Sequence, residues 1–210
     1  MTTYLHHHIK LALSSGLCWL LLSFSVQAEA SFVMSPEYKK ALFVSHANVL
    51  QNTIKRDDVA QLLLNTLPNS IIDLLKKDEE WQDNSQLQQQ VLGNSLALYF
   101  KQLIADKNYS FAEIMLTDAN GALVAAFPKT SDYWQGDEQK FVKPAISQKV
   151  HFSEPNWDES SKAYSFFVSI PVVENNKVIG ILISAMDVTS SYVFEMSLEE
   201  LIEVSIATEE

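Results

Sequence analysis

Residues 113–127 read EIMLTDANGALVAAF and carry the clearest structural pattern of the chain. Two apolar runs, 113–117 and 122–127, flank a short polar segment that ends in Asn120-Gly121. An Asn-Gly pair favours a tight hairpin turn, because both residues tolerate the positive φ angles that such a turn requires. The stretch therefore predicts two antiparallel β-strands joined by a turn at 118–121.

The residues that follow predict the rest of a sheet. Three more strands are expected at 151–155, 164–173 and 178–188. The polar segment 174–177 predicts a second hairpin turn between the last two strands. Between the two hairpins, residues 136–148 predict a short helix packed across one face. Residues 113–188 thus predict a five-stranded antiparallel sheet.

The half of the chain before this sheet has helical periodicity. We expect helices at 35–67, 70–77 and 85–107, with apolar residues recurring at helical spacing. Ser35 and Pro36 suit the start of the first helix, and Pro68 ends it, since proline cannot continue the hydrogen-bond ladder. The charged run 76–80 is interpreted as a solvated turn. After the sheet, residues 197–204 predict a short amphipathic helix.

The N-terminus has the pattern of a secretory signal peptide. Lys10 precedes an apolar run at 11–26, and the small residues Ala28 and Ala30 follow. We expect cleavage after Ala30, or alternatively after Ala28, and export to the periplasm or the medium. The alternative is an uncleaved anchor, although a membrane span needs about 20 apolar residues. The expected organisation is a signal peptide (1–30), a helical part (31–110), a sheet (111–190) and a tail (191–210).

Composition excludes several classes of function. The net charge of −11 argues against nucleic-acid binding, which needs clustered lysine and arginine. Cys18, the one cysteine, lies in the signal segment, so the mature chain is expected to form no disulfide. Only His46 and His151 remain among histidines after cleavage, too few for a zinc site with fixed ligand spacing. With no catalytic motif visible either, we expect no metal, no cofactor and no enzymatic activity.

Three short patterns, taken with the order of the elements, indicate a family. They are DANG at 118–121, DYWQG at 132–136 and IGIL at 179–182. Together they resemble the extracytoplasmic Cache family, the PAS-like ligand sensors of bacteria. The resemblance implies an α+β fold in which long N-terminal helices pack on a five-stranded antiparallel PAS-like sheet. It also implies a small-molecule ligand, a membrane receptor or sensor kinase as partner, and a homodimer through the 35–67 helix.

The same resemblance places the ligand against the sheet, beneath the loop and helix that follow the second strand. The implied binding residues are Asp132, Tyr133, Trp134, Trp157, Tyr164 and Asp187. Aromatic side chains with polar tips suit such a pocket, and Asp187 is implied to receive a ligand ammonium. The other interpretation is structural: Tyr133, Trp134 and Trp157 fill the core, and Asp187 caps the end of its strand.

One departure from the family pattern leaves the ligand class open. Amino-acid binders of the family hold the ligand carboxylate with an arginine, whereas Arg56, the only arginine here, lies in the first helix. Lys129, Lys140 or Lys143 would have to replace it as a point charge. An amine, an amino acid, a small organic acid and a neutral molecule all remain candidate ligands.

Two functions of different classes follow from these observations. The first is an exported sensor that binds a small molecule and reports it to a membrane signalling partner. The second is a ligand-free interaction or dimerisation module of a periplasmic signalling complex, in which the 35–67 helix pairs with itself or with a receptor. An uncleaved signal segment would make the first of these a membrane-tethered sensor.

Overall fold

The computed structural model describes residues 36–66, 70–158 and 163–189, all within the compact unit Ser31–Glu210. The expected signal peptide and the expected helix at 197–204 lie outside the described residues. The helices are α1 (Pro36–Ile54), α2 (Asp57–Leu64), α3 (Ile71–Glu80), α4 (Ser85–Leu92), α5 (Ser95–Ala105) and α6 (Gln139–Ser147). The strands are β1 (Phe111–Asp118), β2 (Leu123–Phe127), β3 (His151–Phe152), β4 (Asn156–Asp158), β5 (Ala163–Glu174) and β6 (Lys177–Asp187).

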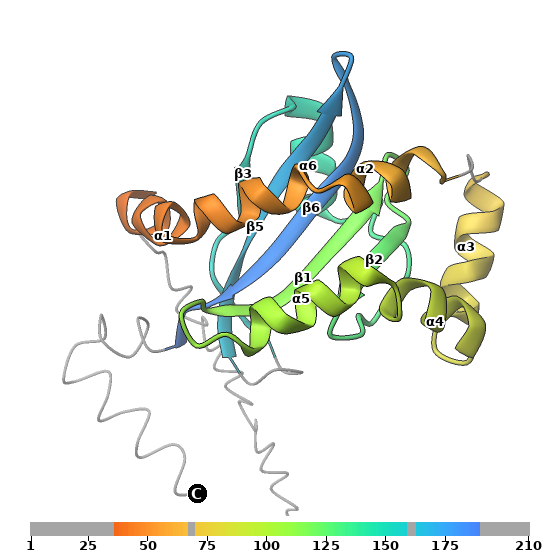
Figure 1. The fold of residues 1–210 in the computed structure, drawn as a ribbon, viewed down its shortest axis with the longest axis horizontal. Helices are drawn as coiled ribbons and strands as arrows, with labels where there is room; N and C mark the ends of the chain where they lie inside the picture. The colour runs from red at the N-terminus through yellow and green to blue at the C-terminus, as the bar shows by residue number, and fades with distance from the viewer. Residues whose placement is uncertain (1–35, 67–69, 159–162, 190–210) are drawn as a thin grey trace, which may run out of the picture. The chain divides into compact units, whose positions relative to one another are not determined.

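The strands form one antiparallel sheet in the order β2-β1-β6-β5-β3 (Figure 1). This arrangement confirms the predicted α+β fold with its antiparallel sheet. The sheet has six strands where five were expected, because residues 156–158, between the predicted strands 151–155 and 164–173, form the short strand β4. This strand pairs with β5, with Trp157 opposite Tyr164, since its extended backbone can use the free edge of β5.

Both predicted hairpins are present. At the first, Gly121 has a φ of 86°, and Asp118 Oδ1 accepts hydrogen bonds from the N–H groups of Asn120 (2.8 Å) and Ala122 (3.0 Å). At the second, Asn175 and Asn176 have φ angles of 50° and 60°. The side chain of Asp118 thus replaces missing backbone partners inside the turn, as aspartate often does in turns.

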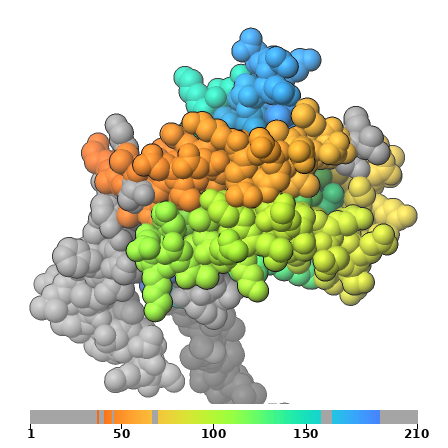
Figure 2. Space-filling model, viewed as in Figure 1, coloured from red at the N-terminus to blue at the C-terminus, as the bar shows by residue number. Residues whose placement is uncertain are grey.

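The sheet is buried on both faces. Figures 1 and 2 show α1 and α2 beside α5, and these helices cover one face of the sheet. Side chains alternate along β1, so that Ile114 and Leu116 pack under these helices, whereas Met115 packs on the opposite face. The core of that opposite face includes Trp81 and Phe141.

The first predicted helix, 35–67, is in fact two helices. α1 ends at Ile54 and α2 begins at Asp57, because Arg56 has an extended backbone with φ −69° and ψ 141°. The Arg56 side chain makes two hydrogen bonds to Asp58, at 2.8 and 2.7 Å, and its guanidinium lies 4.2 Å from the ring centroid of Tyr99. Two aspartates in the first turn of α2 also suit a helix start, since the N-terminus carries a partial positive charge.

The predicted helix 85–107 is also divided, at Gly93 and Asn94. Asn94 Oδ1 accepts a hydrogen bond from the N–H of Ala97 (3.0 Å), which makes Asn94 the N-cap of α5. The amide of the same side chain donates to the carbonyl of Val124 in β2 (2.9 Å). A cap that also bonds to the sheet fixes where α5 begins and how it lies on the sheet.

The charged run 76–80, predicted as a solvated turn, is helical instead. α3 continues to Glu80 and starts at a capping box, in which Ser70 Oγ accepts from the N–H of Asp73 (3.1 Å). The predicted helix at 136–148 is confirmed as α6, with shorter bounds. Among the described residues, no helix is both long and apolar enough to cross a membrane.

We expect the two asparagine caps to differ in their effect on stability. Asn94→Ala removes the cap of α5 and the bond to Val124, so the free energy of unfolding should fall by about 1–3 kcal/mol. Asn84→Ala removes the cap of α4, where Asn84 Oδ1 accepts from Leu87 N–H, and should lower it by about 1 kcal/mol. Urea denaturation of both variants measures the difference. Equal losses would contradict a role for Asn94 in joining α5 to the sheet.

Candidate functional site

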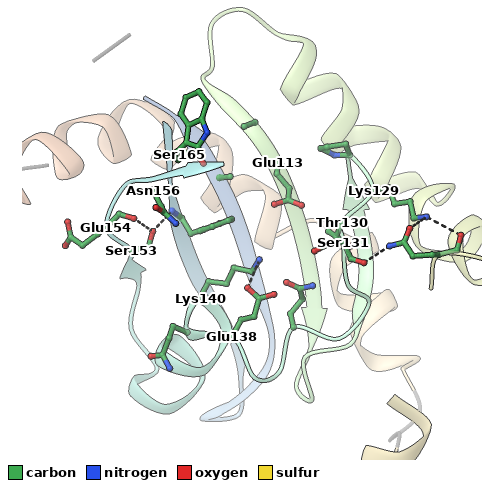
Figure 3. A pocket seen from close by; sticks show the side chains of 18 residues that line it. Glu113, Lys129, Thr130, Ser131, Glu138, Lys140, Ser153, Glu154, Asn156 and Ser165 are labelled. Carbon is green, nitrogen blue, oxygen red and sulfur yellow. Dashed lines mark hydrogen bonds and ion pairs between the residues drawn. The ribbon is translucent and has the colours of Figure 1, made fainter. Parts of the chain in front are cut away.

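A pocket of about 840 Å³ lies on the face of the sheet opposite α1 and α5 (Figure 3). Its floor is a row of residues on three adjacent strands: Glu113 of β1 is paired with Ala185 of β6, which is paired with Phe167 of β5. Ser165 lines the pocket beside this row. Because side chains alternate along a strand, Glu113 lies on the same face as Met115, with its carboxylate on the pocket side.

Three segments form the walls of the pocket. One is the loop 128–131, which follows β2; another is the start of α6, with Glu138 and Lys140; the third is the segment 153–157 around β4. Trp157 lines the third wall with a side chain that is 38% exposed. Pockets of this size, with mixed apolar and polar linings, are typical of small-molecule sites.

The charged groups of the pocket gather where α6 begins. Lys140 Nζ lies 3.0 Å from Glu138 Oε2 and 4.6 Å from the centroid of the Phe167 ring. The Lys140 side chain is 12% exposed, against 38% for that of Glu138. Figure 3 shows Glu113 pointing into the same space from the floor. The pocket therefore holds an ammonium group and carboxylates within one partly dry volume.

The C-terminal end of α3 holds the loop after β2 in place. Asp78 Oδ1 accepts hydrogen bonds from the backbone N–H groups of Tyr133 (2.7 Å) and Trp134 (2.9 Å). Trp81 Nε1 donates to the carbonyl of Thr130 (2.8 Å), and Gln82 Nε2 donates to that of Ser131 (2.6 Å). The contact between Asp78 and the loop was not predicted, because the charged run 76–80 was interpreted as a solvated turn.

The same loop is bonded to the first hairpin. Trp134 Nε1 donates to the carbonyl of Asn120 (2.8 Å), and the N–H of Gln135 donates to that of Gly121 (2.8 Å). The approach is close, since a Cβ on Gly121 would lie 2.5 Å from the Gly136 backbone. Glycine at both positions therefore lets the loop lie directly on the turn.

The loop residues predicted to bind ligand do not line this pocket. Tyr133 is 5% exposed and packs against Trp81, with ring centroids 5.8 Å apart, in the core of the same sheet face. Trp134 covers the first hairpin through its bond to Asn120. Asp132 is exposed, and its carboxylate accepts a hydrogen bond from Ser131 Oγ (2.6 Å).

The three predicted residues on the strands lie near one another. Trp157 lines the pocket and packs edge-to-face on Tyr164, with centroids 5.1 Å apart. Asp187 is paired with Ser165, one row beyond the floor, and does not line the pocket. Its carboxylate accepts hydrogen bonds from Thr189 N–H (2.9 Å) and Thr189 Oγ1 (2.7 Å), which caps the end of β6.

The lysines proposed as substitutes for the missing arginine are also separated by the fold. Lys129 and Lys140 line the pocket, whereas Lys143 is exposed and does not. Glu113 and Glu138 were not among the predicted binding residues. Glu113 carries a local signal, because a carboxylate at the start of an apolar strand is costly to bury unless a partner or a ligand compensates for its charge. In the part of the chain described, no group of three His, Cys, Asp or Glu side chains could hold a metal ion.

A buried carboxylate lies beside Tyr133. Asp118 is 3% exposed, and burial raises its pKa above the ordinary value of 3.8, despite hydrogen bonds from Asn120 and Ala122 N–H that lower it. Burial, together with the nearby charge of Asp118, raises the pKa of Tyr133 to about 12. The hairpin turn on which the loop rests therefore contains a carboxyl group whose charge is disfavoured in the folded protein.

Comparison with known proteins finds likeness in fold alone. No protein-family model matches the chain, and no curated protein matches its sequence. The solved structures with a similar fold include the ligand-binding domain of the amino-acid chemoreceptor PctC of Pseudomonas aeruginosa PAO1 in complex with GABA. It is 15% identical, with a TM-score of 0.44 over 78% of this chain and 61% of the other.

Two further structures belong to the same class. The extracellular domain of rpHK1S-Z16, described as a histidine kinase, is 14% identical, with a TM-score of 0.42 over 77% of this chain and 60% of the other. The ligand-binding domain of the P. aeruginosa PAO1 chemoreceptor PctB in complex with L-Gln is 14% identical, with a TM-score of 0.38 over 75% and 57%. The chain spans about three fifths of the length of the first two structures. All three are described as extracellular or ligand-binding domains.

We expect Asp78→Ala to loosen the loop after β2. Loss of the carboxylate leaves the N–H groups of Tyr133 and Trp134 without their acceptor, so the free energy of unfolding should fall by about 1–3 kcal/mol. Hydrogen exchange at these two amides should accelerate more than at the amides of β1. Glu79→Ala, a change at an exposed neighbour, should alter stability by no more than about 0.5 kcal/mol. Equal effects of the two variants would contradict the assigned role of Asp78.

The raised pKa of Asp118 predicts a pH-dependent difference in stability between the native protein and Asp118→Asn. Because the folded state binds the proton more tightly, the contribution of Asp118 is complete below its ordinary pKa of 3.8 and is lost as the pH rises through the folded value. The native protein should therefore lose stability relative to Asp118→Asn as the pH rises above the ordinary pKa of 3.8. Urea denaturation at several pH values measures this difference. A difference that stays constant or changes in the opposite direction would refute the assignment.

Proposed function

We propose that this chain is an exported sensor domain that binds a small molecule in the pocket between β1, β5 and α6. The observation that supports the proposal is the pocket itself: about 840 Å³, with an aromatic wall at Trp157 and opposite charges at Glu138 and Lys140. A small number of convergent charged groups beside apolar and aromatic side chains is typical of sites that select small polar ligands. The candidate ligands are an amine, an amino acid or a small organic acid.

The proposed mechanism is a shift between two states of the pocket walls. A ligand that binds one state more tightly moves the equilibrium toward it, and only this difference in affinity produces a response. The loop at 128–131 bonds directly to Trp81 and Gln82, at and just beyond the end of α3. A change in the loop would therefore reach α3, where a membrane receptor or sensor kinase could detect it.

The proposal includes a location and a partner. Cleavage near Ala30 would release the protein into the periplasm or the medium, where a sensor of extracellular small molecules has to work. A homodimer through α1 and α2, the helices that replace the predicted 35–67 helix, is proposed as the form that contacts the receptor. Val44 on α1 and Leu64 on α2 are more than half exposed, at 62% and 63%, and offer apolar area for such contacts.

A second function, a ligand-free interaction module, is favoured by one specific observation. α3 exposes three apolar side chains on its surface: Ile71 at 52%, Ile72 at 75% and Leu75 at 44%. Contiguous exposed apolar side chains often mark a surface that binds another protein. In this alternative the pocket has no ligand, and α3 itself contacts a protein partner.

A thermal-shift screen against amines, amino acids, small carboxylates and nucleobases separates the two functions. A ligand at a hundred times its Kd should add about 2.7 kcal/mol to the stability, which raises Tm by several degrees. Trp157→Ala should lose this shift, whereas Ile146→Ala, which truncates an 80% exposed side chain away from the pocket, should keep it. If no compound of the four classes raises the Tm, the interaction module is favoured. A shift that survives in Trp157→Ala would place the ligand elsewhere.

A further inference from the structure

We propose that Glu138 forms an ion pair with Lys140 in the unliganded protein, at the position that a ligand carboxylate takes when it binds. The ligand then displaces the carboxylate of Glu138 from Lys140. The ligand would then be a small carboxylate that binds the Lys140 ammonium, and the Glu138 carboxylate would compete with it for this cation. This inference rests on the proposed function, because it assigns the ligand chemistry of the same pocket. It gives Lys140 the role of a binding residue and Glu138 that of a residue that determines affinity.

Lys140 is fixed in the position that a binding cation requires. Its side chain, 12% exposed, extends from the first turn of α6 to the pocket floor, where the ammonium lies 4.6 Å from the Phe167 ring centroid. An ammonium group has three donors and cannot remain charged in a dry site without an acceptor. Within the described segments of the chain, Glu138 is the one carboxylate within ion-pair distance of Lys140.

Glu138 is held much less firmly than Lys140. It occupies the N-cap position of α6, but its side chain makes no capping hydrogen bond, and it is 38% exposed. Its carboxylate can therefore rotate toward solvent and recover its hydration, at the loss of one ion pair. The two partners of this pair are thus unequal: the cation is packed against the floor, whereas the anion is free to leave.

Exchange of one carboxylate for another keeps Lys140 paired throughout. A ligand carboxylate that takes the place of Glu138 introduces no unpaired buried charge, since the ammonium retains an anionic acceptor. Backbone N–H groups in the first turn of α6 add a weak attraction for an anion at the same position. An ammonium ligand would gain nothing from this exchange, because it would leave Lys140 beside a second cation.

The internal ion pair lowers the apparent affinity of the ligand. Only molecules in which Glu138 has turned away can bind, so the apparent Kd equals the intrinsic Kd divided by the fraction of such molecules. If this fraction is near one tenth, removal of the Glu138 charge should tighten carboxylate binding about tenfold. Binding of amines should not tighten in the same variant.

The test uses two probes that share a carbon chain, butyrate and butylamine, with Kd measured by NMR titration of the purified protein. Glu138→Gln should bind butyrate about tenfold more tightly than the native protein does, and butylamine no more tightly. Glu154→Gln removes the same charge from another wall of the pocket, without a contact to Lys140, and should change the butyrate Kd by less than about twofold. Lys140→Gln should lose butyrate binding. In the double variant, the Glu138→Gln change should give no gain.

Several results would overturn the inference. Equal tightening by Glu138→Gln and Glu154→Gln would show a general effect of charge on the pocket. Failure of both the native protein and Glu138→Gln to bind butyrate would exclude a carboxylate at Lys140, even if an amine binds. If Glu138→Gln were unfolded by circular dichroism, Glu138→Ala provides the same comparison. The proposed function fails separately, when no class of compound shifts the Tm of the native protein.

Discussion

One carboxylate oxygen, Asp78 Oδ1, connects α3 to the loop after β2, the start of which forms one wall of the pocket. It accepts hydrogen bonds from the N–H groups of two consecutive loop residues, Tyr133 and Trp134, which lie beside the first hairpin and the start of β2. A loop packed against a sheet needs partners for its backbone, because an unpaired buried N–H costs about as much as a lost hydrogen bond. A charged acceptor forms stronger bonds than a neutral one, so the side chain of Asp78 can fix both groups at once.

This anchor makes the walls of the pocket unequal. The loop wall is held at Asp78, Trp81 and Gln82 on one side and at the first hairpin on the other. The opposite side of the pocket consists of the segment 153–157 around β4 and the start of α6, with the half-buried Glu138. The loop wall is therefore tied both to the end of α3 and to the first hairpin.

The sheet could be predicted from the sequence, whereas the divisions between helices could not. Asn120-Gly121 and the turn at 174–177 fix their hairpins locally, so no distant contact is needed to find them. Each break between helices also has a local signal in the sequence: aspartates follow Arg56, and Asn94 is a favourable N-cap residue. The apolar periodicity nevertheless continues across both breaks. What decides them is tertiary: Arg56 lies on Tyr99, and Asn94 bonds to Val124 in β2.

The site was harder to predict because its residues come from distant parts of the chain. The pattern at 132–136 placed the binding residues in a loop whose aromatic side chains instead fill the core and cover the hairpin. Asp78, 55 residues before Tyr133, determines how that loop lies, and no periodicity shows this pairing. Trp157, which lines the pocket, was among the residues that the family resemblance implied. Glu113 could have been found by counting alternate positions along β1, since it shares the face of Met115.

The absence of an arginine at the expected position has a physical consequence for selectivity. Arginine binds a carboxylate through two parallel hydrogen bonds and so fixes its plane, whereas lysine is a point charge that accepts a carboxylate in many orientations. With Lys140 as the cation, orientation of the ligand depends on the shape of the pocket and on the side chains opposite, Trp157 and Glu113 among them. In the proposed exchange, the Glu138 ion pair weakens the binding of any carboxylate, because the ligand has to replace an acceptor that already bonds to Lys140. A ligand would bind only when its contacts with the pocket walls offset this loss. Under the proposed exchange, the pocket would reject small anions that bring only charge, and would respond to molecules that also fit its floor and its aromatic wall.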